Sequence, residues 1–348
     1  MRIVVNDIAA SCSGALTILR QFYAYVRKNC PGDEWIFLLG DTYVEETDNI
    51  RVLVFPEVKR SRIRKVWFDC FAGRRVVNAL KPDAVLSLQN IITFGAQAPQ
   101  AVYVHQSIPF QEIRDFSFFK HEERAVAVIQ KIIGQFIIAS VRRAETVIVQ
   151  TSWMREAVAA KTGVPLEKIF VARPDIERLP AMDKPTSFSP RRFFYPTADS
   201  IYKNNDLILE ACQLLNQQGI TDFQVVLTLP PGRYSHPNII CCGYLDKEAL
   251  CAHYLQAVLL FPSYIETIGL PLLEGRALGV PIIAADCPFS KDGLAKYPNA
   301  SFFPPFDAAA LAARMQEAMN LPARRITSDV IDDTSTEWGR VVRALRHP

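Results

Sequence analysis

The sequence predicts an α/β protein of two doubly wound, Rossmann-like domains in tandem, with a cleft between them. Three observations support this prediction. Short runs of β-branched and aromatic residues alternate with longer amphipathic stretches. The short runs are almost continuously apolar, as expected of parallel strands that are covered on both faces. The chain, at 348 residues, is also long enough for two domains.

The predicted elements follow one another in a regular strand–helix order. In the first half the strand candidates are Ile3–Val5, Trp35–Leu39, Val52–Phe55, Ala84–Leu88, Val102–Val104, Val147–Val149 and Ile169–Val171. In the second half they are Arg192–Tyr195, Gln224–Leu227, Ile239–Cys241, Val258–Phe261 and Ile282–Ala284. Helical stretches between the strands include Leu16–Lys28, Glu122–Arg143, Asp206–Gln217, Lys247–Leu255 and Ala308–Met319.

A proline-rich segment separates the two series of elements. Four prolines lie from Pro174 to Pro190, and the segment has no apolar periodicity, which indicates an interdomain linker. We therefore predict a first domain over residues 1–178, a linker over 179–190 and a second domain over 191–333.

Composition and charge exclude several classes of protein. Hydrophobic residues make up 49% and charged residues 22% of the chain, so it is neither disordered nor collagen-like. A net charge of +3 does not favour a dedicated nucleic-acid binder. The charge is uneven, because residues 1–175 hold 23 Lys and Arg against 18 Asp and Glu (23 − 18 = +5), which leaves −2 for the rest. The first half is therefore the one that would prefer an anionic surface.

The sequence favours a cytoplasmic location. The apolar run at the N-terminus, Ile3–Val5, is too short for a signal peptide, and the run 132–141 is about half the length that spans a bilayer. No Cys-x-x-Cys pair occurs, so we expect reduced cysteines and no metal or redox site. The eight cysteines are Cys12, Cys30, Cys70, Cys212, Cys241, Cys242, Cys251 and Cys287.

The segment 261–281 is the most informative for chemistry. An apolar strand ends at Phe261, a loop carries Glu266, and Gly269 allows close approach of the backbone to a ligand. A helix is predicted from Leu270 to Gly279, whose free N–H groups form an anion site with Glu274 one turn in. Such a site suits a ligand with phosphates and hydroxyls, the carboxylate taking a ribose diol. Alternatively, Glu274 is only a favourable charge near a helix N-terminus.

Two further polar residues follow predicted strands. His105 comes after Val102–Val104, where it either faces a ligand or is a satisfied structural residue. Lys203 precedes a predicted helix; a cation there invites an anion, although a solvated lysine is the simpler interpretation.

The segment 59–75 combines basic and aromatic residues. It has seven basic residues and one acidic residue, with Trp67, Phe68 and Phe71 among them. This pattern suits contact with anionic lipid headgroups. A solvated loop that leads into a helix with core-facing aromatics explains it equally well.

The segment 261–281 resembles the Glu-x7-Glu signature of the family 4 glycosyltransferases, retaining enzymes of the GT-B fold. Most of the chain shares the resemblance, in the family's order. The other segments that carry it are Ser11-Cys12-Ser13-Gly14, Val102-Tyr103-Val104-His105, Val147-Ile148-Val149-Gln150-Thr151-Ser152, Tyr202-Lys203-Asn204 and Gly243-Tyr244-Leu245. The last helix, residues 334–348 with Trp338, resembles the family's tail that returns to the first domain.

The resemblance implies a role for each matched position. Glu274 would hold the donor ribose, and Lys203 would neutralise the diphosphate leaving group. Glu266, together with the backbone of Ile268, Gly269 and Leu270, would hold the transferred sugar and its phosphates. His105 would line the reaction centre, Gly14 would lie near the diphosphate or acceptor, and Gly243 with Tyr244 would form the base site. The catalytic candidates are therefore His105, Lys203 and Glu266, with an acceptor-side first domain and a donor-binding second domain.

Two departures from the family's pattern stand out. The positions five and six residues before Lys203 are Ala198 and Thr197, where the family usually has an Arg. Either one phosphate contact is missing, or it comes from elsewhere, with Arg173 and Arg192 as the candidates. The first loop has one glycine instead of two or three.

The resemblance thus implies a hexosyltransferase that needs no cofactor, since its nucleotide sugar is a substrate. No Asp-x-Asp occurs in the chain, which argues against dependence on a divalent cation, so we expect a metal-independent enzyme. It would act on a glycan or lipid-linked acceptor in bacterial surface polysaccharide synthesis, as a peripheral protein on the inner face of the plasma membrane. The alternatives are a non-catalytic GT-B-fold partner that binds nucleotide sugar or acceptor, and another GT-B enzyme such as a sugar-nucleotide epimerase.

Overall fold

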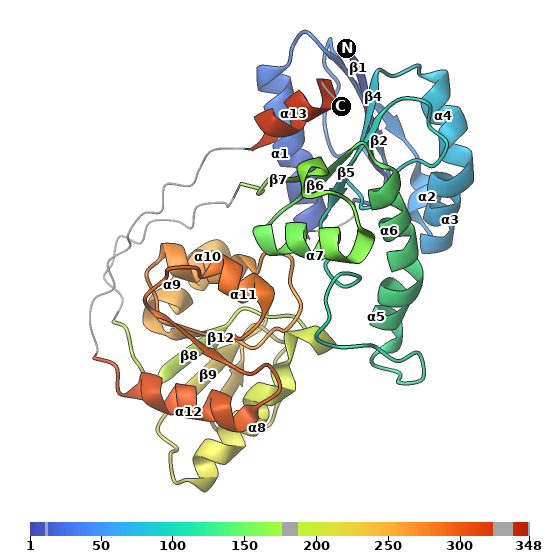
Figure 1. Ribbon diagram of the computed structural model, residues 1–348. Coiled ribbons are helices and arrows are strands. Elements are labelled where there is room, and N and C mark those ends of the chain that lie inside the picture. The colour runs from blue at the N-terminus through green and yellow to red at the C-terminus, as the bar shows by residue number, and fades with distance from the viewer. Residues whose placement is uncertain (11–12, 176–186, 323–336, 347–348) are drawn as a thin grey trace. The chain divides into compact units, whose positions relative to one another are not determined.

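The structure is a computed structural model that describes residues 1–10, 13–175, 187–322 and 337–346 (Figure 1). It divides into two compact units, one formed by Met1–Asp175 with Ser335–Pro348 and the other by Ile176–Thr334. Most of the predicted linker, residues 179–186, lies outside the described residues.

The first unit contains a parallel sheet flanked by helices. Its strands are β1 (Arg2–Asp7), β2 (Glu34–Leu39), β3 (Ile50–Val54), β4 (Ala84–Ser87), β5 (Gln100–Val104), β6 (Thr146–Val149) and β7 (Ile169–Val171). Its helices are α1 (Ser13–Asn29), α2 (Pro56–Lys59), α3 (Arg62–Trp67), α4 (Gly73–Ala79), α5 (Arg124–Val128), α6 (Gly134–Arg143), α7 (Ser152–Thr162) and α13 (Trp338–Arg346). Shorter turns are the π-helical η1 (Phe68–Ala72) and η2 (Ile129–Ile133) and the 3₁₀ turn η3 (Leu166–Lys168).

The second unit repeats this architecture. Its strands are β8 (Arg192–Tyr195), β9 (Gln224–Leu227), β10 (Ile239–Cys241), β11 (Val258–Phe261), β12 (Ile282–Ala285) and β13 (Ala300–Phe303). Its helices are the 3₁₀ turn η4 (Ile201–Lys203), α8 (Asn205–Gln217), α9 (Lys247–Gln256), α10 (Leu270–Ala277), α11 (Pro288–Gly293) and α12 (Ala308–Met319).

Both sheets are doubly wound, which confirms the predicted fold class. The strand order is β3-β2-β1-β4-β5-β6-β7 in the first sheet and β10-β9-β8-β11-β12-β13 in the second. Every ladder described in the two sheets is parallel. The order reverses beside β1 in the first sheet and beside β8 in the second, and such switch points are where open α/β sheets bind ligands.

Two differences from the predicted elements affect the second unit. β13 was not predicted, because Ala300–Phe303 holds no β-branched residue that would mark it as a strand. Helix α10 ends at Ala277, with Leu278 as its C-cap, two residues before the predicted end at Gly279. Glu274 therefore belongs to the second turn of a short helix.

Among the residues that the structure describes, one helix is long and apolar enough to cross a membrane, by length and composition only. It is the continuous helical segment Arg124–Arg143, of 20 residues. A core helix passes the same test, and Ile137, Ile138 and Val141 are buried in one hydrophobic cluster with residues of β5 and β6. The apolar run 132–141 is thus part of a helical segment that agrees with the predicted stretch Glu122–Arg143.

The described cysteines are free thiols. Cys30, Cys212, Cys251 and Cys287 are buried, whereas Cys70, Cys241 and Cys242 are partly buried. Cys12 lies outside the described residues.

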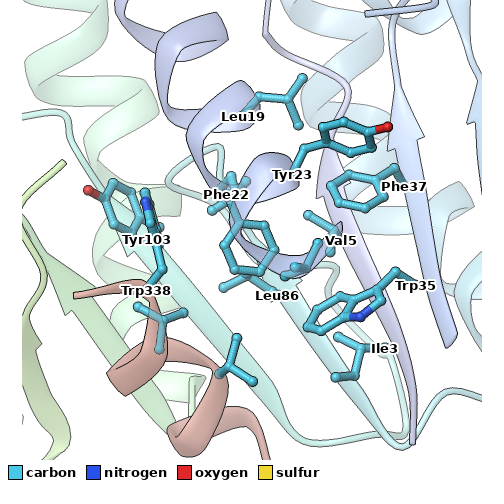
Figure 2. Packing of buried hydrophobic residues seen from close by; sticks show 14 of the residues in the cluster. Ile3, Val5, Leu19, Phe22, Tyr23, Trp35, Phe37, Leu86, Tyr103 and Trp338 are labelled. Atoms are coloured by element: carbon cyan, nitrogen blue, oxygen red, sulfur yellow. The ribbon is translucent and has the colours of Figure 1, made fainter. Parts of the chain in front are cut away.

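An aromatic cluster joins α13 to the core of the first unit. The ring of Trp338 lies 5.4 Å from that of Phe22 in α1 and 5.6 Å from that of Tyr103 in β5 (Figure 2). Trp35 in β2 packs edge-to-face on Phe22 at 5.6 Å. Trp338, Val341 and Leu345 are buried in this cluster, one turn apart on one helix face. α13 thus covers β4 and β6 of the first sheet.

We expect Trp338→Ala to destabilise the first unit by about 3–5 kcal/mol, because a fully buried indole is replaced by a cavity. Trp67→Ala, at a position that is 59% exposed, is the control and should change the free energy of unfolding by less than about 0.5 kcal/mol. Urea unfolding followed by circular dichroism measures both. Equal stability of the two variants would mean that α13 does not contribute to the core.

Candidate functional site

The central strands of the second sheet bring the two predicted charges together. β8 and β11 are neighbours, Lys203 lies at the end of η4 after β8, and Glu266 lies in the loop after β11. Lys203 Nζ is 2.5 Å from Glu266 Oε1, although the two residues are 63 apart in sequence. The side chains are 19% and 17% exposed, so the pair is partly buried and still within reach of a ligand.

Hydrogen bonds fix the loops that carry this pair. Tyr264 donates its backbone N–H to the carbonyl of Tyr202 at 3.0 Å. Ser263 Oγ is buried and lies 3.1 Å from the same carbonyl and 2.8 Å from Glu266 Oε1. Asn204, whose φ is 58°, donates Nδ2–H to the carbonyl of Pro262 at 3.3 Å. The Lys203 and Glu266 side chains are therefore held in place before any ligand binds.

The N-terminus of α10 lies next to the Glu266 loop. Gly269 is its N-cap with φ 72°, a conformation that a side chain would strain. A Cβ added there would lie 3.2 Å from Leu272 Cδ1. The Ile268 side chain is buried, whereas that of Leu270 is 44% exposed. Pro271 has no N–H, and the N–H of Leu272 donates to the carbonyl of Gly269 at 2.8 Å. At this helix N-terminus the N–H of Leu270 is therefore the group that would favour an anion.

Glu274 has a partner that the sequence did not reveal. Its Oε2 accepts a hydrogen bond of 2.6 Å from the hydroxyl of Tyr254 in α9, a residue that is 1% exposed. Burial raises the pKa of Glu274, and the Tyr254 hydrogen bond acts in the opposite direction. A carboxylate accepts several hydrogen bonds, so Tyr254 orients Glu274 and leaves capacity for ligand hydroxyls. The sequence signal was a tyrosine on the buried side of a predicted helix, since a buried tyrosine hydroxyl usually has a partner.

The predicted base site lies after the edge strand β10. Gly243 has φ 77° and donates its N–H to the carbonyl of Leu229 at 2.8 Å, which fixes the turn. Tyr244 follows with 94% of its surface exposed, so its ring is available to a ligand. Both residues follow the carboxyl end of β10, as Lys203 and Glu266 follow their own strands.

Neither of the two arginines suggested as a replacement for the missing one lies at the carboxyl edge of the second sheet. Arg192 is the first residue of β8, at the amino end of the strand, and its Nη1 donates to Gln256 Oε1 at 2.7 Å. Arg173 belongs to the first unit. A different arginine, Arg233, lies in the loop after β9 and pairs with Asp199 in the loop after β8, at 3.1 and 3.4 Å. It is 30 residues beyond Lys203, outside the window in which a family motif would place it.

In the first unit, His105 follows β5 and is clamped by Asn90. Asn90 Oδ1 accepts the backbone N–H groups of His105 and Gln106 at 2.7 and 2.9 Å. The amide nitrogen of Asn90 therefore faces His105 Nε2 at 3.0 Å, and the ring nitrogen accepts. This arrangement needs a neutral imidazole. Burial, and to a lesser extent the charge of Lys65, lowers the pKa of His105 to about 4.

Gly14 lies in the first turn of α1, after β1. A Cβ at this position would meet nothing within 4 Å, so packing does not require a glycine here. Ser11 and Cys12 of the same predicted loop lie outside the described residues. Gly14 and His105 thus belong to the first unit, and the other site candidates belong to the second.

Two buried carboxyl groups lie at the edge of the first sheet where the strands have their carboxyl ends, as His105 does. Asp7 ends β1, and Asp69 comes from η1; both are at most 1% exposed. Asp69 Oδ1 accepts from Gln89 Nε2 at 2.8 Å and from Asn6 Nδ2 at 3.3 Å. Burial raises the pKa of Asp7 to about 7 and that of Asp69 to about 7, and the positive charge of Lys65 opposes both shifts. Sequence reasoning missed this cluster.

No group of three or more His, Cys, Asp or Glu residues that could hold a metal ion occurs in the described part of the chain.

Comparison with protein families gives one match in the second unit. A family model described as glycosyl transferases group 1 matches residues 235–331. The matched segment contains Gly243, Tyr244, Glu266, Gly269 and Glu274. No curated protein sequence matches the chain.

Solved structures match over almost the whole chain. WaaG, a glycosyltransferase involved in lipopolysaccharide biosynthesis, matches with a TM-score of 0.68 and 12% identity, over 99% of this chain and 100% of that chain. Anabaena HepE, in complex with UDP and glucose, matches with a TM-score of 0.62 and 14% identity, over 99% of both chains. Sucrose-phosphate synthase from Thermosynechococcus elongatus matches with a TM-score of 0.60 and 17% identity, over 99% of this chain and 94% of that chain.

The chain has the GT-B fold. Its two doubly wound units match these glycosyltransferase structures from one end to the other, although few residues are identical.

The buried carboxyls of the first unit generate a prediction for stability against pH. Between pH 4 and 7 the folded protein keeps protons on Asp7 and Asp69 that the unfolded chain has lost, so these residues lower the free energy of unfolding as pH rises through this window. We expect Asp7→Asn to reduce the fall in Tm between pH 5 and pH 8 by about 3 °C or more. Differential scanning calorimetry at both pH values measures it.

The control is Asp48→Asn, at an exposed position of the same unit, whose pH dependence should equal that of the unmodified protein. A fall in Tm that is unchanged in Asp7→Asn would show that Asp7 ionises as easily in the folded state as in the unfolded chain.

Proposed function

We propose that this protein is a retaining, metal-independent glycosyltransferase of the hexosyltransferase type. It moves a sugar from a nucleotide-sugar donor to a glycan or lipid-linked acceptor, in the synthesis of bacterial surface polysaccharide, at the cytoplasmic face of the membrane. The observation that carries the proposal is the Lys203–Glu266 pair at the carboxyl ends of two adjacent central strands, next to the N-terminus of α10. The family match over 235–331 supports it.

The donor would occupy the carboxyl edge of the second sheet. The N-terminus of α10, with the N–H of Leu270, and the Lys203 ammonium suit a diphosphate, and Glu274 suits the two hydroxyls of a ribose. Tyr244 would stack on the base, since its ring is 94% exposed beside a fixed turn. HepE, which shares the fold, is described in complex with UDP and glucose, and this supports a nucleotide-sugar donor.

Transfer breaks the bond from the anomeric carbon to the diphosphate oxygen and forms a bond from that carbon to an acceptor hydroxyl oxygen. The leaving diphosphate takes the hydroxyl proton, and attack from the same face retains the configuration. Negative charge grows on the diphosphate as the bond breaks, and Lys203 together with the helix N-terminus compensates it without a metal ion. Glu266 is held by Lys203 and Ser263, so it would bind sugar hydroxyls and does not act as a nucleophile.

The proposal assigns roles to three further residues. Neutral His105 would exchange hydrogen bonds with a hydroxyl of the transferred sugar, because Asn90 fixes its ring. Arg233 would supply the second phosphate-binding cation, since it lies in the loop after β9 and only Asp199 engages its guanidinium as an ion pair among the described residues. Gly14 would lie near the diphosphate or acceptor, as the family resemblance implies.

One observation favours a second candidate function, a non-catalytic GT-B partner that binds nucleotide sugar or acceptor. Positions 197 and 198 hold Thr and Ala where related enzymes usually carry a phosphate-binding Arg. Slow hydrolysis of the donor without acceptor distinguishes the two. An enzyme releases nucleoside diphosphate from one donor of a UDP-, GDP- and ADP-sugar panel, whereas a partner subunit binds a donor without turnover.

Glu274→Ala should weaken nucleoside diphosphate binding by about 1.5–3 kcal/mol, roughly 10- to 150-fold in Kd, because a charge-assisted hydrogen bond is lost. Tyr254→Phe removes only the group that orients Glu274, so about 0.5–1.5 kcal/mol is expected. Isothermal titration calorimetry with UDP, GDP and ADP measures both. An affinity that is unchanged in the folded Glu274→Ala variant would exclude the ribose role.

Lys203→Ala should lower kcat more than it raises the donor KM, because the leaving-group charge grows toward the transition state. Lys161→Ala, at an exposed position on α7 of the first unit, is the control and should leave both constants unchanged. Steady-state rates of nucleoside diphosphate release provide the measurement. If only KM rises in Lys203→Ala, the lysine binds ground-state phosphate and does not assist departure.

A further inference from the structure

The continuous helical segment α3-η1-α4, Arg62–Ala79, has one solvent-exposed face of unusual composition. Its exposed residues recur at the spacing of a helix, three, four, three and one residues apart, so they form one stripe. They are Arg64, Trp67, Phe71, Arg74 and Arg75, and Ala79 is exposed one turn further on. We call this stripe the Arg–aromatic face.

The two aromatic residues of this face have no place in the core. Trp67 and Phe71 are each 59% exposed, although they lie four residues apart on the same side of the helix. The other tryptophans with a stated exposure, Trp35 and Trp338, are at most 1% exposed. Phe68, which lies between Trp67 and Phe71 in the sequence, is buried against Phe55, with ring centroids 5.4 Å apart. The structure thus separates the core-facing aromatic from the two that face outward.

The charges on this helix are sorted in the same way. Asp69, the acidic residue of the segment 59–75, is fully buried, so it takes no part in the exposed face. Lys65 does not belong to the exposed face, because its charge interacts with the buried carboxyl groups of Asp69 and Asp7. Three exposed arginines flank the two rings. Arg64 lies one turn before Trp67 and pairs with the exposed Glu57 of α2 at 3.1 Å, and Arg74 and Arg75 lie one turn after Phe71.

This alternation fits a lipid surface. Trp is an amphipathic ring that prefers the headgroup boundary, and an Arg guanidinium binds phosphate oxygens in pairs. Each aromatic of the face has a cation within one turn, so ring insertion and phosphate contact occur together. Residues 1–175 carry a net charge of +5, which also favours contact with a negatively charged surface. A nucleic acid would need a more basic chain than one of net charge +3.

We propose that the Arg–aromatic face docks the protein on an anionic membrane surface, with Trp67 and Phe71 inserted at the headgroup boundary and Arg64, Arg74 and Arg75 on lipid phosphates. This inference deepens the proposed membrane location and does not depend on the transfer chemistry. It also gives the location a purpose, because the same helix contributes Lys65 and Asp69 to the edge of the sheet that bears His105. A docked helix would hold that edge near lipid-linked acceptors.

The test uses the full chain without donor or acceptor. Co-sedimentation is measured with vesicles of 30% phosphatidylglycerol in phosphatidylcholine and with pure phosphatidylcholine, at low salt. We expect binding to the anionic vesicles only, with a Trp fluorescence that shifts to the blue and is quenched by brominated lipid. Trp67→Phe should keep most of the binding and lose the quenching, because the emission of Trp67 is the one that reports insertion.

Variants of the face should weaken binding in proportion to what they remove. Trp67→Ser with Phe71→Ser should reduce the vesicle partition coefficient at least 10-fold. Arg74→Gln with Arg75→Gln should reduce it about 25-fold at low salt, about fivefold per charge. The matched controls lie elsewhere on the first unit: Leu166→Ser, at an exposed apolar position, and Lys161→Gln with Lys168→Gln, at exposed basic ones. The controls should bind vesicles as the unmodified protein does, and circular dichroism verifies that all variants are folded.

Three results would overturn the proposal: equal binding of the unmodified protein to both vesicle types, no binding to either, or undiminished binding when the face is changed. If the unmodified protein is instead a dimer in solution that the Trp67→Ser, Phe71→Ser variant dissociates, the face is a protein interface. Because no step involves a nucleotide sugar, failure of transfer activity leaves this result unaffected, and the reverse also holds.

Discussion

Parallel strand alignment is the constraint on which the other features of this structure depend. Since every described ladder is parallel, each strand must be followed by a crossover, and the carboxyl ends of all strands in a sheet come to one edge. This is why Lys203 and Glu266 meet across 63 residues of sequence. It is also why Asp7 and His105 gather at one edge of the first sheet, each at the end of its own strand. The strands are buried on both faces by the crossover helices, which explains their continuous apolar character.

The fold and part of the site could be predicted from the sequence, because strand ends and crossovers leave a clear local pattern. The position of Glu266 follows from that pattern, because this residue lies in the loop after a predicted strand. Lys203 was placed only before a predicted helix, and its role came from the family resemblance. Tyr254 and Arg233 could not be found in this way, since their partners depend on how a helix and a loop pack against distant segments. The edge strand β13 was missed because Ala300–Phe303 lacks β-branched residues, so its pairing depends on β12 and not on its own propensity.

The segment 59–75 shows why composition alone left two interpretations open. Lysine, arginine and aromatic residues are mixed along the sequence, and only the helical phase separates them. Phe68 and Asp69 face inward, whereas Trp67 and Phe71 face outward, so each of the two interpretations describes one face of the same helix. Trp67 and Phe71 lie four residues apart, which places both on the same side of the helix, with Phe68 and Asp69 between them.

The position of α13 in the chain has a consequence for biosynthesis. The first unit needs Trp338 beside Phe22 and Tyr103, yet about 160 residues of the second unit are translated between Asp175 and this helix. While the ribosome makes them, the apolar surface of β4, β6 and α1 that α13 later covers stays open to water and to other nascent chains. The second unit is one uninterrupted segment and can fold as soon as it emerges. The domain that is made first is therefore the one that matures last.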